Sequence, residues 1–124
     1  MDCCGKYYYL DGLILDAGAT EEQPPGETSF YEVIRTSGGI PLFFGDHIRR
    51  LEEGITTRYD VPENLESHIA TGINTLAQMD PVPQINIRVT VAFTGREHTL
   101  HICYVTSIYP SEKMYTDGVK VILY

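Results

Sequence analysis

Positive charge is scarce in this chain of 124 residues. Nine Lys and Arg side chains stand against seventeen Asp and Glu, so the formal net charge is −8. Phosphate binding needs a clustered positive surface, and the only adjacent basic pair is Arg49-Arg50, so a nucleic-acid partner is not expected. No apolar run approaches the roughly 20 residues that span a bilayer. The N-terminus lacks the basic and apolar regions of a secretory signal.

Cysteine is also sparse. The three residues are Cys3, Cys4 and Cys103, an odd number with two neighbours. This pattern predicts no disulfide framework and a reduced, cytoplasmic location. His98, His101 and Cys103 are close in sequence, but strand side chains alternate between faces, so His98 would point away from the other two. Two ligands on one face fall short of the usual four of a zinc site, so no metal site is expected.

Short apolar or alternating runs predict four strands in the first 44 residues. A hairpin at Asp11-Gly12 divides 7–15 into two strands, and a loop rich in Pro and Gly follows over 16–28. Apolar and polar side chains alternate over 29–36, which predicts a strand. A Ser-Gly-Gly turn follows, and residues 40–44 are expected to form the next strand.

Two helices are expected next. Asp46 is a suitable N-cap for the first helix, because its carboxylate can accept hydrogen bonds from first-turn amides. Pro62-Glu63 suits the opening of the second helix, and Pro81 ends it. Their apolar stripes are Ile48, Leu51 and Ile55 in the first helix, and Leu65, Ile69, Ile73 and Leu76 in the second.

Apolar and polar side chains alternate over residues 84–94, and 100–108 continue the pattern. This predicts an antiparallel hairpin of two strands. The order of elements predicts one α+β domain: an antiparallel β-sheet with two α-helices packed on one face. We expect this small domain to cover residues 1–118. Residues 119–124 would begin an interdomain linker or second domain, whose remainder is absent.

No nucleophile elbow, phosphate-binding loop or dinucleotide fingerprint is present. Candidate chemistry therefore rests on a few side chains. Arg50, early in the first helix, could present its planar fork to a phosphate. Arg88 lies on the strand face opposite the apolar row, where its head could meet a carboxylate. For both arginines the alternative is a solvated side chain. For Tyr31 the alternative is packing or cross-strand pairing.

The run Ser29–Arg35, a Gly-Gly turn and the run Asp46–Leu51 resemble the N-terminal domain of class IV pyridoxal-phosphate enzymes. These are the branched-chain and D-amino-acid aminotransferases and aminodeoxychorismate lyase. Residues 9–14 resemble the family's first hairpin, and Asn86-Ile87-Arg88 its substrate-side strand. One departure is Pro25-Gly26-Glu27-Thr28, which stands where the family carries an aromatic-Gly pair.

The resemblance implies that the cofactor is pyridoxal 5'-phosphate and that Arg50 binds its phosphate. Tyr31 and Arg88 would contact the substrate, with Arg88 near its carboxylate. The full-length enzyme would be a homodimer that transfers an amino group between an amino acid, branched-chain by preference, and a 2-oxo acid. The family's Schiff-base lysine lies in a second domain, and none of Lys6, Lys113 and Lys120 has a matching context. No catalytic residue is therefore expected in this chain, which alone would be inactive.

Two alternatives remain open. The chain could be part of an aminodeoxychorismate lyase. It could also be a stand-alone, non-catalytic module that binds a small molecule or dimerises. In that module the tyrosines at 7–9, taken as exposed, and the uncovered sheet face would make the contacts.

Overall fold

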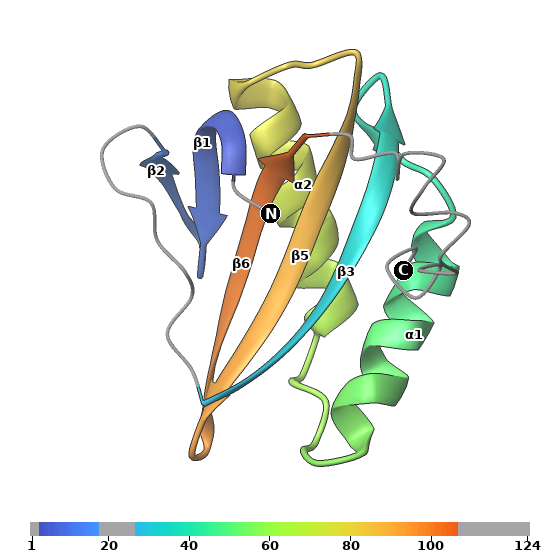
Figure 1. The fold of residues 1–124 in the computed structure, drawn as a ribbon, viewed down its shortest axis with the longest axis vertical. Helices are drawn as coiled ribbons and strands as arrows, with labels where there is room; N and C mark the ends of the chain where they lie inside the picture. Colours follow the sequence, from blue (N-terminus) through green and yellow to red (C-terminus); the bar gives the residue numbers. More distant parts are fainter. Residues whose placement is uncertain (1–2, 18–26, 107–124) are drawn as a thin grey trace, which may run out of the picture.

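The structure is a computed structural model that describes residues 3–17 and 27–106. Figure 1 shows these residues as a twisted sheet with helices beside it. The described strands are β1 (Cys3–Leu10), β2 (Leu13–Asp16), β3 (Thr28–Ser37), β4 (Ile40–Pro41), β5 (Gln84–Thr94) and β6 (Glu97–Val105). The described helices are α1 (Phe44–Thr56) and α2 (Leu65–Met79), and neither is long and apolar enough to cross a membrane.

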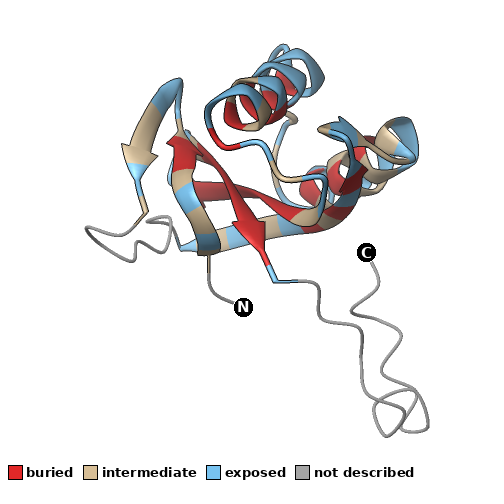
Figure 2. Ribbon diagram, turned by 90° about the horizontal axis from the view of Figure 1, so that it is seen from above, coloured by how far each residue is buried: buried red, intermediate tan, exposed pale blue. Residues whose placement is uncertain are grey.

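The sheet has the order β2-β1-β6-β5-β3-β4, and every neighbouring pair is antiparallel. Both helices lie on one face of it (Figure 2), so the predicted α+β architecture is confirmed. Strand β6 ends at Val105, so the expected continuation to Thr106 is wrong. Ile108, the domain boundary at 118 and the expected linker or second-domain residues 119–124 lie outside the described residues.

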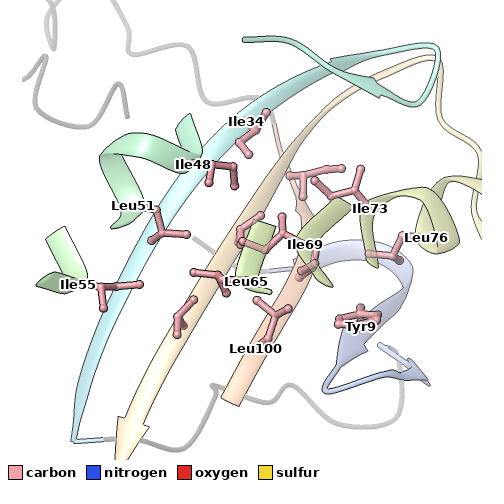
Figure 3. Close-up of a cluster of buried hydrophobic side chains, with 14 of the residues drawn as sticks. Tyr9, Ile34, Ile48, Leu51, Ile55, Leu65, Ile69, Ile73, Leu76 and Leu100 are labelled. Atoms are coloured by element: carbon pink, nitrogen blue, oxygen red, sulfur yellow. The ribbon is translucent and has the colours of Figure 1, made fainter. Parts of the chain in front are cut away.

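The helix-covered face of the sheet holds the main apolar core (Figure 3). The predicted stripes of both helices are confirmed, since each of their members is at most 3% exposed. These stripes pack on alternate residues of β5, which are Ile87, Val89, Val91 and Phe93. Burying each such side chain contributes about 1.5–3 kcal/mol, so this layer supplies most of the hydrophobic stabilisation.

The opposite face of the sheet carries a second, smaller cluster of Tyr8, Cys103 and Val105. Arg88 and His101 are also buried on this face. Tyr8 and Tyr9 are only 4% and 8% exposed, and Tyr7 is half-buried. The expectation that these tyrosines form an exposed contact surface is therefore wrong, because β1 lies inside the sheet between β2 and β6.

The start of α1 differs from the sequence-based expectation. Strand β4 stops at Pro41, and the helix begins at Phe44 rather than after an Asp46 cap. Phe43 takes the capping position in the left-handed region, with φ of 54°, and offers no side-chain hydrogen bond. This tight turn brings the chain into the helix three residues early, so Asp46 falls within the first turn. There its carboxylate lies 3.5 Å from Arg49.

The start of α2, in contrast, is later than expected, at Leu65 instead of Pro62-Glu63. Asn64 precedes it in the left-handed region, with φ of 60°, a conformation that Asn tolerates better than most residues. At Gly72 the helix approaches the sheet closely. A Cβ atom there would lie 2.6 Å from Cδ1 of Ile102 and 3.2 Å from the ring of Tyr9.

Strand β1 is irregular near its start. Cys3 pairs with Val105, whereas Tyr8 pairs with Cys103, so five residues of β1 advance against two of β6. Gly5 permits this bulge, because a Cβ there would lie 2.7 Å from the Tyr104 ring. The bulge shifts the alternation of side chains and places Cys3 on the same face as Tyr8.

Candidate functional site

Arg50, the predicted phosphate ligand, lies on α1 against strand β3. Its Nε atom is 3.5 Å from Oε1 of Glu32, and its Nη2 atom is 3.0 Å from Nδ1 of His47. The same Nδ1 lies 2.7 Å from Oε1 of Glu32. The Glu32 side chain is 6% exposed and that of Arg50 is 38% exposed. The carboxylate therefore lies behind the arginine and holds it at a partly open surface.

His47 cannot satisfy both neighbours through one nitrogen. With a hydrogen on Nδ1 it donates to Glu32, and with a lone pair there it accepts from Arg50. A carboxylate only accepts, and its oxygen is the nearer atom, so we assign Nδ1–H to donation to Glu32. The imidazole then fixes the carboxylate, and the carboxylate fixes the guanidinium.

Glu32 was not selected from the sequence as a site residue, although a signal was available. It shares strand parity with Phe30 and Ile34, which face the apolar core. A carboxylate on the core-facing side of a strand needs a partner, because burying an unpaired charge is costly. The pattern alone could not identify that partner, since α1 follows β3 only after a hairpin.

Tyr31 and Arg88 lie on the other face of the sheet. Tyr31 is opposite Thr90, and Arg88 is opposite Val33, so the two are diagonal neighbours on adjacent strands. Tyr31 is 55% exposed, whereas Arg88 is 9% exposed. The structure thus brings two of the three predicted residues to one face. It places Arg50 on the helix-covered side.

The head of Arg88 extends toward β6 and β1 rather than toward Tyr31. Its Nη2 atom lies 3.6 Å from Sγ of Cys103 and 3.8 Å from Sγ of Cys3. These two cysteines form a disulfide, with Cα atoms 5.6 Å apart. The expectation of no disulfide is therefore wrong. Strand alternation along the sequence did not reveal the pair, because the bulge in β1 decides which face Cys3 occupies.

His101 completes this group. The residue is 1% exposed, its ring centroid is 5.2 Å from that of Tyr8, and neither ring nitrogen has a hydrogen-bond partner. Burial, and secondarily the charge of Arg88, lowers the pKa of His101 to about 4. The imidazole is therefore neutral at neutral pH. The prediction that His101 and Cys103 share a face is confirmed by their common contacts with this cluster.

One hollow of the described surface lies away from all of these residues. It is formed where the end of α1 meets the β5–β6 turn, and its lining includes Arg58, Tyr59 and Arg96. Tyr59 stacks on Phe93 with ring centroids 4.2 Å apart. The lining contains none of Arg50, Tyr31 and Arg88, so the predicted site residues are not gathered in this hollow.

Comparison with solved structures identifies proteins that have a similar fold. A branched-chain amino acid aminotransferase from Escherichia coli superposes with a TM-score of 0.68 at 11% identity, over 83% of this chain and 41% of that chain. The corresponding enzyme from Thermobaculum terrenum (M4 mutant) gives 0.67 at 17% identity, over 84% and 39%.

The chain has the fold of the small domain of these aminotransferases. This confirms the resemblance to class IV enzymes at the level of the fold. The chain spans about two fifths of the length of the structures it matches. No protein-family model and no curated protein sequence matches it.

Proposed function

We propose that this chain is the small domain of a pyridoxal-phosphate-dependent class IV aminotransferase that acts on amino acids and 2-oxo acids. Branched-chain amino acids are the favoured substrates, because the superposed structures are named for them. The observation that carries the proposal is the aminotransferase small-domain fold together with an arginine, Arg50, held in place at a partly open surface. The homodimer and the cytoplasmic location belong to the same proposal.

The residues at Arg50 fit a phosphate group. The Nε atom of this guanidinium lies on the edge that faces Glu32, 3.5 Å from Oε1 of the carboxylate. Five N–H donors in a rigid fork allow one guanidinium to bind a carboxylate behind it and a phosphate beside it. Such charge-assisted hydrogen bonds contribute about 1.5–3 kcal/mol each when shielded from water.

The edge of β3 explains how residues from both faces could serve one site. In the described residues, β4 pairs with β3 only at Thr36 and Ser37. Beyond that point Glu32 and Tyr31 point to opposite faces of β3, so a ligand lying along its edge could contact Arg50 on one side and Tyr31 on the other. Arg88 is one strand further in, on the face of Tyr31.

In this proposal each site residue has a separate role in binding cofactor or substrate. When bound, pyridoxal 5'-phosphate supplies the electron sink for chemistry at the substrate α-carbon. Arg50 anchors the phosphate, and Glu32 and His47 orient Arg50. Tyr31 and Arg88 bind the substrate end, with Arg88 offering its charge to the carboxylate. No residue of this chain is assigned the covalent role of the Schiff-base lysine, so the chain by itself is proposed to be inactive.

The test uses the full protein encoded by the gene that contains this chain. Arg50→Ala should weaken retention of pyridoxal phosphate by about 10–100-fold, the equivalent of one charge-assisted contact. Arg49→Ala is the matched control, because Arg49 is the neighbouring residue on α1 and its side chain is 65% exposed. Cofactor affinity equal in both variants would remove Arg50 from the phosphate site. A gene that encodes no lysine beyond Tyr124 in a second domain would refute the aminotransferase proposal.

Arg88→Ala separates substrate binding from cofactor binding. We expect it to raise KM for the amino acid while cofactor retention stays near that of the unmodified protein. Equal damage to both quantities would argue for a structural role of Arg88 beside the cysteine pair.

A further inference from the structure

A second group of chemistry-bearing side chains lies apart from Arg50 and Tyr31. The Sγ atoms of Cys3 and Cys103 and a ring nitrogen of His101 all lie within 4.8 Å of one another. They come from β1 and β6, on the sheet face opposite the helices. The inference drawn from them does not depend on the proposed aminotransferase function.

His101 is the observation that points to a ligand. Both of its ring nitrogens are buried without a hydrogen-bond partner. A buried polar group that is left unsatisfied costs about 1–3 kcal/mol. The ring is packed against Tyr8, which fixes its plane. A metal ion bound to one nitrogen would offset part of this cost.

The donor set selects the class of ion. Two sulfur atoms and one imidazole suit a thiophilic cation such as Zn²⁺, whereas Mg²⁺ and Ca²⁺ prefer oxygen ligands. With Zn–S near 2.3 Å and Zn–N near 2.0 Å, tetrahedral zinc holds its ligand atoms about 3.5–3.8 Å apart. The three atoms here are close enough to reach that spacing through small side-chain movements, once the two sulfurs are no longer bonded to each other.

Arg88 makes the sulfur atoms better ligands. Its Nη2 atom is 3.6 Å and 3.8 Å from them, and a neighbouring positive charge favours thiolates over thiols. Two thiolates neutralise a divalent cation, so the guanidinium would face an uncharged centre instead of a dication. Cys3 is the one ligand that is not fully buried, so the fourth coordination position lies on its side.

We propose that the reduced chain binds one Zn²⁺ through Cys3, Cys103 and His101, and that the Cys3–Cys103 disulfide is the oxidised, metal-free alternative. A dithiol reductant donates two electrons and two protons to the disulfide, giving two thiols while it becomes a disulfide itself. Zn²⁺ then displaces the two thiol protons and forms two Zn–S bonds and one Zn–N bond. In the reverse direction a disulfide oxidant accepts two electrons, takes two protons from solvent and becomes two thiols, while the Cys3–Cys103 S–S bond forms again and Zn²⁺ is released.

Zinc titration of the 124-residue chain tests this directly. The chain is reduced without oxygen by a water-soluble phosphine, and Zn²⁺ is added in competition with a coloured chelator. We expect one ion per chain, bound with a sub-micromolar Kd, and no uptake by the oxidised chain. Co²⁺ in place of Zn²⁺ should show a sulfur-to-metal charge-transfer band. Failure of the reduced chain to take up one equivalent of zinc would overturn the proposal.

Matched variants identify the ligands. Cys103→Ser and His101→Gln should each weaken zinc binding by more than about 100-fold, because even partners outside the ligand shell contribute roughly 10–100-fold. Cys4→Ser and His98→Gln are the controls, since both residues are exposed and adjoin the cluster in sequence. Unchanged affinity in His101→Gln, or an equal loss in the controls, would refute this ligand set. If a ligand variant fails to fold, stabilisation of the reduced, unmodified chain by zinc remains decisive, and its absence counts against the site.

Discussion

The two faces of the sheet bury different kinds of side chain. The helix-covered face is a layer of aliphatic side chains from α1, α2 and alternate sheet residues. The opposite face buries Arg88, His101 and a disulfide beside a small apolar cluster. Apolar packing is non-directional and tolerates local shifts, whereas the second face depends on which atoms meet. The two faces thus stabilise the domain in different ways, one through apolar packing and the other through specific contacts among buried polar and sulfur atoms.

Loss of the disulfide on the second face should cause the largest change in the free energy of unfolding. It closes a loop with a sequence separation of 100 residues. In the chain-entropy account, a loop of that size raises the free energy of unfolding by about 4–5 kcal/mol. Denaturant unfolding of the oxidised and the reduced, zinc-free chain measures the difference. Cys4→Ser should leave it intact, whereas a Cys103→Ser variant as stable as the oxidised chain would contradict the prediction.

The helix-covered face should respond most to loss of volume. Ile69 is fully buried between α2 and the sheet, so Ile69→Ala should lower the free energy of unfolding by about 2–5 kcal/mol through lost burial and a residual cavity. Asn74→Ala, on the exposed side of the same helix, should change it by less than about 0.5 kcal/mol. Urea denaturation of both variants measures the contrast. Similar losses would mean that α2 does not bury this stripe.

Alkaline pH should weaken the covered face through Tyr104. Burial, and secondarily the charge of Asp80, raises the pKa of Tyr104 to about 12, and its hydroxyl donates to the backbone carbonyl of Asp80 at 2.7 Å. The neutral phenol is favoured in the folded state. Its contribution is therefore complete below pH 10 and falls by up to about 3 kcal/mol as pH rises to 12.

Chemical denaturation from pH 9 to about 12 measures this slope. Tyr104→Phe, which cannot ionise, should flatten part of it. Tyr31→Phe, at an exposed tyrosine on the other face, should not. Identical alkaline slopes in all three proteins would exclude Tyr104 as the cause.

The smallest effects should come from two helix glycines, and they should differ in sign. At Gly54 a new Cβ would meet only the Phe30 ring at 3.6 Å, so Gly54→Ala should stabilise the chain by about 0.5–1 kcal/mol through helix propensity. At Gly72 it would lie 2.6 Å from Cδ1 of Ile102, so Gly72→Ala should destabilise by about 1 kcal/mol net. Thermal unfolding of both variants provides the comparison, and stabilisation by both would show that α2 can move away from the sheet.

The covered face was largely predictable from the sequence. The stripes of α1 and α2 repeat with the period of a helix, and 84–94 alternates with the period of a strand, so each element's buried side follows from local chemistry. The starts of both helices were missed because Phe43 and Asn64 adopt left-handed conformations that end the preceding segment. No periodic pattern encodes such turns.

The candidate site was predictable only in part. The sequence placed Arg88 on the face opposite the apolar row, and the structure agrees. It placed Arg50 early in the first helix, but Arg50 lies in the middle of α1, because the helix already begins at Phe44. The sequence could not show that Glu32 lies behind Arg50, because β3 and α1 meet only through tertiary packing. The roles of these residues toward cofactor and substrate stay predictions.

The sequence by itself determined which residues form the sheet and helices and which of their sides are apolar, because both depend on interactions between residues close in the chain. Only the tertiary structure decided that Cys3 joins Cys103, that His101 lies beside them, and that Arg50 of α1 packs against β3 on the face opposite Tyr31. The physical reason is register: one bulge in β1 changes which face a side chain occupies. Within that irregular stretch the backbone N–H of Lys6 donates to Oδ2 of Asp80, 74 positions away, which is a contact that only the tertiary structure provides.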